Sequence, residues 1–320
     1  MENIMVSVLC ATYNQDKYIE ETLESLVRQK TDFNFEIIVH DDASTDKTPF
    51  ILKKYKEKYP SLVKIITQNE NQYSKGVSIT REFLLPVAKG KYFAFCEGDD
   101  FWIDEYKLQK QVDYMESHPN CSFCTHNSIS VDESGKFKED FITKKSGGVV
   151  TTDEVILGMG GFCATNSILA PTILTKNLPN YFDICTMDLV WQMYLASQGE
   201  TYCFKEKMSA YRIGAIGSWS NAMRKSDIKK RKDFYDKIIN VRREFDKDTN
   251  YVYHESVDKV IRTIQLKRAV LLKDYKELRT GFYKDIYRNY DIRIKIKIWL
   301  LKFTPGLYSI IAEKKGWKNI

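Results

Sequence analysis

Three carboxylates fall within four consecutive positions of the sequence, in the segment EGDD at residues 97–100. They directly follow the apolar run YFAFC, which is typical of a buried β-strand. Glu97, Asp99 and Asp100 repel one another, so we expect them to hold something cationic. Clustered carboxylates without His or Cys partners select a hard cation, and the segment therefore predicts a Mg²⁺ or Mn²⁺ site. The alternative is a solvated turn that holds nothing.

A glycine-rich phosphate loop is absent from the sequence. Neither GxGxxG nor GxxxxGK[ST] follows any predicted strand. A nucleotide diphosphate would therefore need another source of neutralisation. A metal held by the acids would keep open positions that phosphate oxygens can fill.

Polar side chains also follow two other predicted strands. Thr12, Tyr13 and Asn14 end the first strand, and Asp41 and Asp42 end the second. Ligands of an open parallel sheet bind beyond the carboxyl ends of its strands, so these groups should converge with the acids. A carboxylate at position 42 would accept the N3–H of uracil, and Tyr13 could stack on the base, which predicts a uridine nucleotide. Alternatively, the two aspartates cap the following helix.

The elements that must position these groups alternate between strand and helix. Strands are predicted at residues 6–14, 35–42, 62–68 and 92–100, with helices at 17–30, 45–59 and 78–88 between them. This order predicts an α/β fold with a Rossmann-like, mainly parallel sheet flanked by helices.

The rest of the chain is predicted to be mixed and then helical. We expect helices at 106–117, 151–159 and 189–199, and strands at 121–131 and 148–152 around a polar loop at 132–140. After residue 221 the pattern is helical and basic. We therefore predict a mixed α/β domain at 1–220 and a helical C-terminal region at 221–320.

Four stretches resemble the family 2 glycosyltransferases of GT-A fold: VSVLCATYNQDKYIEETLESLVRQ, EIIVHDDASTD, GKYFAFCEGDDFW and TMDLVWQMYLASQG. The resemblance spans roughly residues 4–215. It implies that the domain at 1–220 is catalytic, with a nucleotide-sugar part at about 1–105 and an acceptor part at about 106–220. It implies inverting, metal-dependent transfer of a sugar, such as a hexose, from a nucleotide-diphosphate sugar to a glycan hydroxyl in bacterial surface polysaccharide synthesis. The acceptor would be a glycan or a lipid-linked glycan.

The resemblance also implies roles for individual residues. Asp42 would contact the base, Asp99 the ribose or metal, and Asp100 the metal, with Glu97 beside them. Asp188 matches the family's general base, although Met187 stands where a Glu is usual.

Arg81 would face the diphosphate. Gly214 occupies the position where the family often has a metal-binding His. From the residues alone, Asp188 could instead be the N-cap of the helix that follows it.

Two alternative functions share these features. A sugar-phosphate nucleotidyltransferase would use the same sheet and acids, but it should show a glycine- and basic-rich loop after the first strand. The segment CATYNQDKY does not fit that loop. A non-catalytic nucleotide or glycan binder would not need both Asp100 and Asp188.

Charge divides unevenly along the chain. Residues 221–320 hold 26 Lys and Arg against 13 Asp and Glu, a net charge of +13, whereas residues 1–220 hold 23 against 30, a net charge of −7. The basic part lacks a nucleic-acid-binding motif. Residues 292–317 alternate cations with bulky apolar residues, which predicts an interfacial helix at an anionic membrane; the alternative is a terminal helix packed on the core.

No run of about 18 apolar residues occurs, and the first ten residues lack the features of a secretory signal. We therefore expect a cytoplasmic protein, peripheral at the inner face of the plasma membrane.

Overall fold

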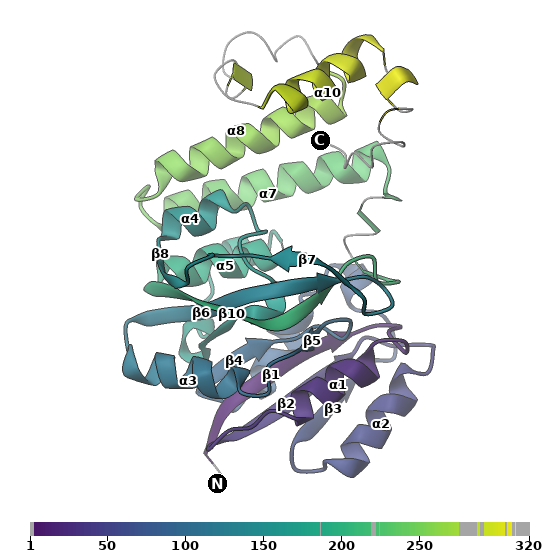
Figure 1. Cartoon of the computed structure of the whole chain (residues 1–320), viewed down its shortest axis with the longest axis vertical. Coiled ribbons are helices and arrows are strands. Elements are labelled where there is room, and N and C mark those ends of the chain that lie inside the picture. The colour runs from purple at the N-terminus through teal and green to yellow at the C-terminus, as the bar shows by residue number, and fades with distance from the viewer. Residues whose placement is uncertain are drawn as a thin grey trace. The chain divides into compact units, whose positions relative to one another are not determined.

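We describe a computed structural model of the chain. It describes residues 3–185, 187–218, 222–223, 225–274, 287–288, 291–304, 306–308 and 311. The chain divides into two compact units, Met1–Arg224 and Lys225–Ile320. Figure 1 labels the helices and strands of both units.

The first half of unit 1 is a parallel sheet. Strands β1 (Ile4–Thr12), β2 (Asn34–Asp41), β3 (Val63–Thr67) and β4 (Tyr92–Phe95) lie in the order β3-β2-β1-β4. Helices α1 (Ile19–Val27) and α2 (Thr48–Lys58) connect the first three strands. Because β2 and β4 lie on opposite sides of β1, the strand order reverses there, and a crevice is expected at the carboxyl ends.

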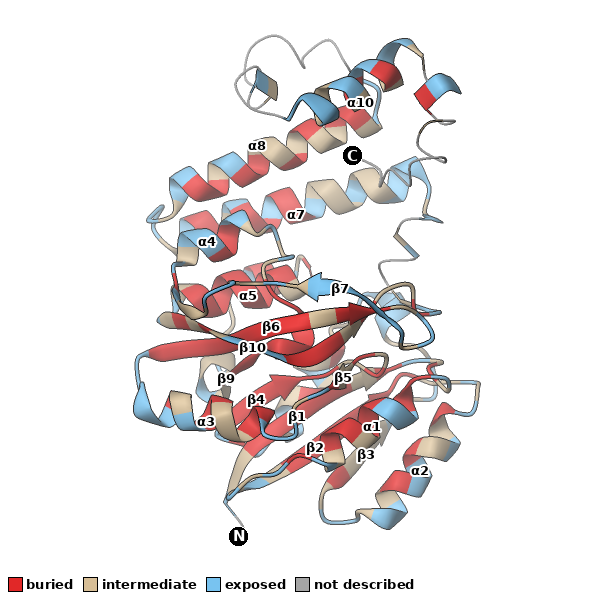
Figure 2. Cartoon of the chain, in the orientation of Figure 1, coloured by how far each residue is buried: buried red, intermediate tan, exposed pale blue. Residues whose placement is uncertain are grey.

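Near-continuous burial explains why these strands form. β4 is buried at all four positions, and β1 and β2 are buried over most of their length (Figure 2). A parallel strand covered on both faces is expected to be apolar throughout. Val8, Ile37 and Val39 of these strands share one core cluster with Leu23 of α1 and Leu52 of α2.

The second half extends the same sheet. Strands β9 (Leu169–Pro171), β6 (Cys121–Val131), β10 (Glu200–Arg212) and β5 (Phe101–Trp102) follow β4 in that order, and β6 pairs with β10 in parallel. Helices α3 (Lys107–Ser117), α4 (Thr152–Leu157) and α5 (Asp188–Ser197) accompany them. The predicted α/β fold with a mainly parallel sheet is thus confirmed.

Two local predictions differ in part from the structure. The segment at 78–88 is helical as expected, but it forms a π-helix at Thr80–Leu84 followed by a 3₁₀ helix at Leu85–Val87. Pro86 explains the change, because proline lacks an N–H and its ring clashes with the preceding helical turn. The loop expected at 132–140 contains strand β7 (Phe137–Phe141), which returns antiparallel to β6, and β8 (Gly148–Val150) pairs with β10.

Unit 2 contains the helices α7 (Ile228–Asp248), α8 (His254–Leu271) and α10 (Ile292–Phe303). α10 packs on α8 through a small cluster of buried side chains. None of the helices in the described ranges is long and apolar enough to cross a membrane. The part of the predicted interfacial segment at 312–317 lies outside the described residues.

Candidate active site

A pocket of about 270 Å³ lies at the carboxyl ends of β1, β2 and β4, where the sequence places its polar residues. A smaller hollow of about 120 Å³ shares several lining residues with it, Glu97 and Asp188 among them. Residues that line the first pocket include Thr12, Tyr13, Gln15, Asp42, Asn71, Tyr73, Glu97, Asp99, Asp188, Tyr211 and Arg212. The pocket therefore brings together the carboxyl ends of β1 and β10 and the loops that follow β2, β3 and β4.

Four acids line this pocket, and one of them, Asp42, follows β2. Glu97 and Asp99 come from the loop after β4, and Asp188 comes from the start of α5. Burial, followed by the charges of Asp188 and Asp99, raises the pKa of Glu97 well above its usual range. Burial also raises the pKa of Asp99, against an opposing hydrogen bond from Gln15 and the charge of Arg212. The pocket therefore concentrates negative charge that a cation would relieve.

Asp100 is buried close enough for its charge to act on Glu97, but it does not line the pocket, and its role as a metal ligand stays a prediction. It is buried outside the pocket lining, and its Oδ1 accepts the backbone N–H of Arg212 at 2.8 Å. Its Oδ2 accepts the side-chain amide of Asn166 at 2.9 Å. Both oxygens thus have protein donors, which suits a residue that anchors the acidic loop.

Arg212, at the end of β10, organises this loop, and the sequence analysis gave it no role. Its Nε donates to the backbone oxygen of Asp99 at 2.8 Å, and its guanidinium pairs with Glu21 at 2.5 Å. The same group lies 4.8 Å above the ring of Tyr18. One buried cation therefore fixes the loop that carries Asp99, although β10 itself was not predicted.

Asp188 is the first residue of α5, whose N-cap is Met187. The N-cap role considered for Asp188 is therefore taken by another residue. The hydroxyl of Thr165 donates to Asp188 Oδ2 at 2.6 Å. Burial raises the pKa of Asp188, while this hydrogen bond acts in the opposite direction. A carboxylate with raised proton affinity and a fixed orientation has the properties of a general base.

The turn at Thr165–Ser167 supports both halves of the site. Thr165 holds Asp188, and its neighbour Asn166 holds Asp100 and the backbone oxygen of Ala210 in β10. Nothing in the sequence pattern marks this turn, because its role depends on contacts with residues at least 23 positions away.

The loop after β1 divides its predicted residues between two places. Thr12 and the half-exposed Tyr13 line the pocket, and Thr12 donates to Gln15 Oε1 at 2.8 Å. Asn14 lies outside the lining. It has a φ of 51°, and its Oδ1 accepts the backbone N–H of Thr45 at 2.7 Å. Asn14 therefore ties two loops together at the edge of the pocket.

Asp42 lines the pocket but also supports it. Its two oxygens accept the backbone N–H groups of Gln72 at 2.8 Å and Tyr73 at 3.0 Å. Each carboxylate oxygen has a second lone pair available for a ligand. Tyr73, which the sequence analysis also missed, lines both hollows, and burial and the charge of Glu97 raise its pKa to about 12.

Arg81 does not reach the described pocket. Its guanidinium pairs with Asp183 at 2.5 Å and with Glu82 at 2.9 Å. The predicted contact with a diphosphate would require both ion pairs to rearrange. The structure instead uses Arg81 to connect the turn after β3 with the segment that precedes α5.

A divalent cation would find two of the pocket-lining carboxylates, Glu97 and Asp99, on the one loop that follows β4. Among the described residues, no group of three or more His, Cys, Asp or Glu side chains is arranged to hold a metal ion. Two carboxylates are enough for Mg²⁺, which usually keeps several waters and takes further oxygens from substrate phosphates. The raised proton affinity of both acids fits such a cation, because a positive charge there would offset burial and repulsion.

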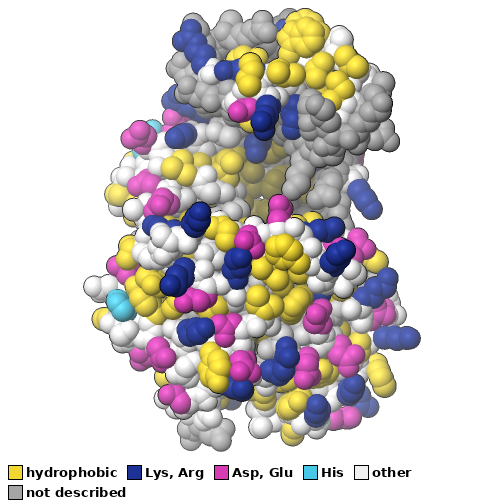
Figure 3. Space-filling view, viewed as in Figure 1, with side chains coloured by type: hydrophobic (Ala, Val, Ile, Leu, Met, Phe, Trp, Pro, Cys, Tyr) yellow, Lys and Arg dark blue, Asp and Glu magenta, His cyan; other side chains and the backbone are white. Residues whose placement is uncertain are grey.

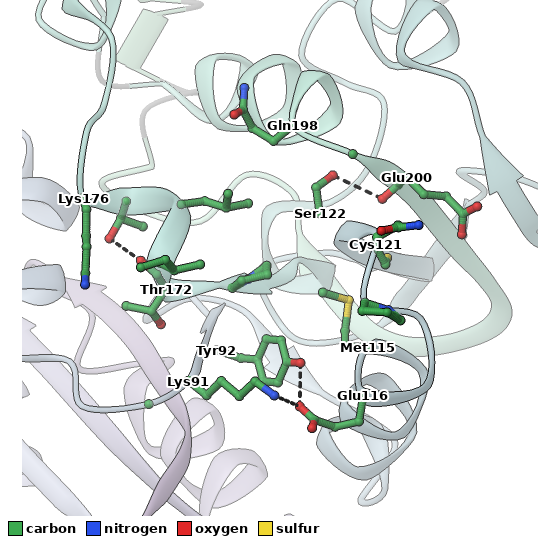
Figure 4. A pocket seen from close by; sticks show the side chains of 18 of the residues that line it. Lys91, Tyr92, Met115, Glu116, Cys121, Ser122, Thr172, Lys176, Gln198 and Glu200 are labelled. Carbon is green, nitrogen blue, oxygen red and sulfur yellow. Dashed lines mark hydrogen bonds and ion pairs between the residues drawn. The ribbon is translucent and has the colours of Figure 1, made fainter.

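A larger cavity, of about 1020 Å³, lies at the opposite edge of the sheet (Figure 4). Its lining includes the start of β4, the start of β6 and the ends of α3 and α5. Its acid Glu116 already pairs with Lys91 and accepts the hydroxyl of Tyr92, each at 2.6 Å. Size therefore does not identify the site, whereas the cluster of acids at the carboxyl ends of the strands does.

The fold and the pocket define an α/β protein with a ligand site of the kind that binds nucleotides. More specifically, the chain belongs to Glycosyl transferase family 2, whose model matches residues 7–169.

Individual proteins are also similar to this chain. A Mycobacterium tuberculosis protein is 34% identical over 221 residues, covering 68% of this chain and 61% of its own length. The chain thus spans less than two thirds of that relative. The Escherichia coli UDP-Glc:α-D-GlcNAc-diphosphoundecaprenol β-1,3-glucosyltransferase WfaP is 39% identical over 113 residues, which is 35% of this chain and 42% of that protein.

Two solved structures share the fold. Staphylococcus aureus TarS (residues 1–349), in complex with UDP-GlcNAc, gives a TM-score of 0.63 at 20% identity, covering 93% of this chain and 79% of that one. The Pyrobaculum calidifontis mannosyltransferase PcManGT, in complex with GDP-Man and Mn²⁺, gives 0.53 at 14% identity, covering 98% and 88%. These likenesses confirm the predicted GT-A fold.

Proposed function

We propose that the chain is a metal-dependent, inverting glycosyltransferase that moves a sugar from a UDP-sugar to a glycan hydroxyl in bacterial surface polysaccharide synthesis. The observation that carries the proposal is the single pocket in which Glu97, Asp99 and Asp188 meet. Family membership supports sugar transfer. The name of the E. coli relative supports a UDP-linked donor and a lipid-linked glycan acceptor.

The donor would lie across the carboxyl ends of β1 and β2. Tyr13 would stack on the base, and the free lone pairs of Asp42 would accept the N3–H of uracil. Gln15 would support Asp99 through a hydrogen bond. Thr12 would hold Gln15 in place, because its hydroxyl donates to Gln15 Oε1. Asp42 would have a second role besides contacting the base, because it accepts the backbone N–H of Tyr73 and so holds that residue beside the acids.

Transfer would be a single displacement. The acceptor oxygen attacks the anomeric carbon, the bond from that carbon to the diphosphate breaks with its electron pair, and Asp188 takes the hydroxyl proton. Thr165 would keep the carboxylate aimed at the acceptor. Mn²⁺ or Mg²⁺, held by Asp99 with Glu97 beside it, would supply charge neutralisation for the leaving diphosphate.

Calorimetric titration with UDP, CDP and GDP, each with and without Mn²⁺, tests the donor assignment. We expect UDP to bind most tightly and Mn²⁺ to strengthen binding of all three diphosphates. Asp42→Asn should remove the advantage of UDP with or without metal. If the variant weakens all three nucleotides equally, Asp42 acts only through the Tyr73 loop, and equal wild-type affinities would contradict a uridine site.

The alternatives make different predictions. Family membership gives the nucleotidyltransferase no support. A non-catalytic binder would bind nucleotide but would release no nucleoside diphosphate from a nucleotide sugar. A turnover assay with a panel of nucleotide sugars therefore distinguishes it from an enzyme.

A further inference from the structure

α10 has an inner apolar side that is already occupied. Ile298 is buried in a cluster with Leu266, Ala269 and Val270 of α8, and Ile294 and Leu301 pack against the same cluster. This contact shows that α10 packs on another helix of unit 2. It leaves the opposite side of α10 to be explained.

The opposite side carries a second apolar row, which we call the outer stripe: Ile292, Ile296, Trp299 and Phe303. These side chains are 65%, 46%, 47% and 52% exposed. Their spacing of four, three and four residues places them on one face of a helix. The rings of Trp299 and Phe303 lie 5.4 Å apart, so the stripe ends in an exposed aromatic pair.

Cations flank the outer stripe on both sides. At 100° per residue, Arg293 falls on one flank and Lys295 and Lys302 on the other. Residues 292–303 contain no acid. Lys302 Nζ lies 4.8 Å from the ring centre of Phe303. Figure 3 shows hydrophobic side chains at the surface over α10, with Lys and Arg close by.

We propose that the outer stripe lies in the surface of an anionic phospholipid membrane, with α10 parallel to the plane. An apolar row between two basic flanks matches an interface in which acyl chains lie below a layer of negative headgroups. The 12-residue helix is about 18 Å long, so it is too short to span the bilayer. The net charge of +13 over residues 221–320 adds long-range attraction to the same surface.

Two other bulky residues of α10 do not belong to the outer stripe. Leu300 is buried, and Leu301 packs on the α8 cluster. The distinction permits substitutions that remove the outer stripe while leaving the α8 contact intact.

Vesicle sedimentation with the full chain tests the proposal. We expect binding to vesicles of phosphatidylglycerol and phosphatidylcholine (3:1), little binding to pure phosphatidylcholine, and weakening as salt rises. Ile296→Gln with Phe303→Gln should lower binding by about tenfold or more. Phe50→Gln is the matched control, since Phe50 is 73% exposed on α2 of unit 1, and it should change nothing.

A second variant tests the charges separately. Arg293→Gln with Lys302→Gln should lower binding to the anionic vesicles by about fivefold per charge and flatten the salt dependence. Both double variants should keep the wild-type thermal melt, because the substituted side chains are exposed. Trp299 fluorescence should shift to shorter wavelength on vesicles, and Trp299→Phe should remove that shift.

Several results would overturn the proposal. These are equal binding to both kinds of vesicle, binding unchanged by both double variants, or a wild-type fluorescence shift that survives Trp299→Phe. Concentration-dependent self-association that is abolished by the stripe variant, with no vesicle binding, would assign the stripe to a second copy of the chain.

Discussion

At the scale of single residues, the site depends on which way each carboxylate faces. Adjacent residues Asp99 and Asp100 have the same chemistry, but only Asp99 lines the pocket. Asp100 receives two protein hydrogen bonds instead. The sequence pattern cannot distinguish these two aspartates. The difference arises because Asn166 and Arg212, which lie far along the chain, donate hydrogen bonds to Asp100.

Asp99→Asn and Asp100→Asn should therefore have different effects. Asp99→Asn should remove most of the Mn²⁺-dependent gain in UDP affinity and leave the stability near normal. Asp100→Asn turns an amide N–H toward one of its two donors, so we expect a loss of about 1–3 kcal/mol of unfolding free energy. Titration calorimetry and urea unfolding of both variants measure the pair, and reversed results would return the metal role to Asp100.

Asp188→Asn tests the general base. The amide cannot take the acceptor proton, so transfer should fall by about a hundredfold or more while UDP affinity stays near the wild-type value. The measurement is the rate of nucleoside diphosphate release with acceptor present. Thr165→Val is the companion variant, because it removes only the 2.6 Å hydrogen bond and should give a smaller loss. Full activity in Asp188→Asn would reassign this residue to structure.

At the scale of elements, the sequence identified most of the sheet that positions the site. β3 and β4 fall within the predicted strands and α1 and α2 within the predicted helices, while β1 and β2 overlap their predicted strands and begin two residues and one residue earlier. Long apolar runs and amphipathic periods are local signals, which is why these elements could be predicted. β10 was missed. Its middle residues 205–207 are exposed and charged, which interrupts the alternation. Arg212, at its end, could not be placed without it.

The loop after β4 needs glycine at position 98. A Cβ there would lie 2.3 Å from Gln15 Oε1 and 2.7 Å from Thr12 Oγ1. Because Gln15 supports Asp99, Gly98→Ala should cost about 1–3 kcal/mol and weaken Mn²⁺-dependent UDP binding. Gly161→Ala is the control, since its nearest contact would be 3.7 Å away. Equal behaviour of the two variants in calorimetry and unfolding would contradict this account of the loop.

α3 begins with a buried lysine that should make stability depend on pH. Lys107 Nζ donates to Gln111 at 2.6 Å and lies 4.0 Å from the Trp102 ring. Burial lowers its pKa to about 7. The unfolded chain, with a lysine pKa near 10.4, therefore binds more protons between about pH 7 and 10, and stability should rise with pH across that window.

Lys107→Met should remove this dependence. Between pH 7 and pH 9, the wild type should gain about 2 kcal/mol relative to the variant in denaturant unfolding. Taking the difference cancels groups common to both proteins, such as the thiols. A difference that is constant with pH would show that Lys107 keeps an ordinary pKa in the folded protein.

At the scale of the whole molecule, the two units differ in charge as well as in structure. Residues 1–224 carry a net charge of −6 and contain every residue assigned to the pocket, whereas residues 225–320 carry +12. This separation was readable from the sequence, because it is a property of composition. The sequence did not show which apolar residues of α10 are exposed, because the inner and outer rows are both apolar.

The most direct test of the central claim is turnover of a panel of nucleotide sugars, scored as release of the nucleoside diphosphate with Mn²⁺ and with chelator. We predict that at least one UDP-sugar is hydrolysed slowly without acceptor, that chelator stops the release, and that Asp99→Asn reduces it. Release of nucleotide from no sugar in the panel, while UDP still binds, would contradict the claim and favour a non-catalytic binder. Release that is unaffected by chelator and by Asp99→Asn would contradict the metal-dependent pocket itself.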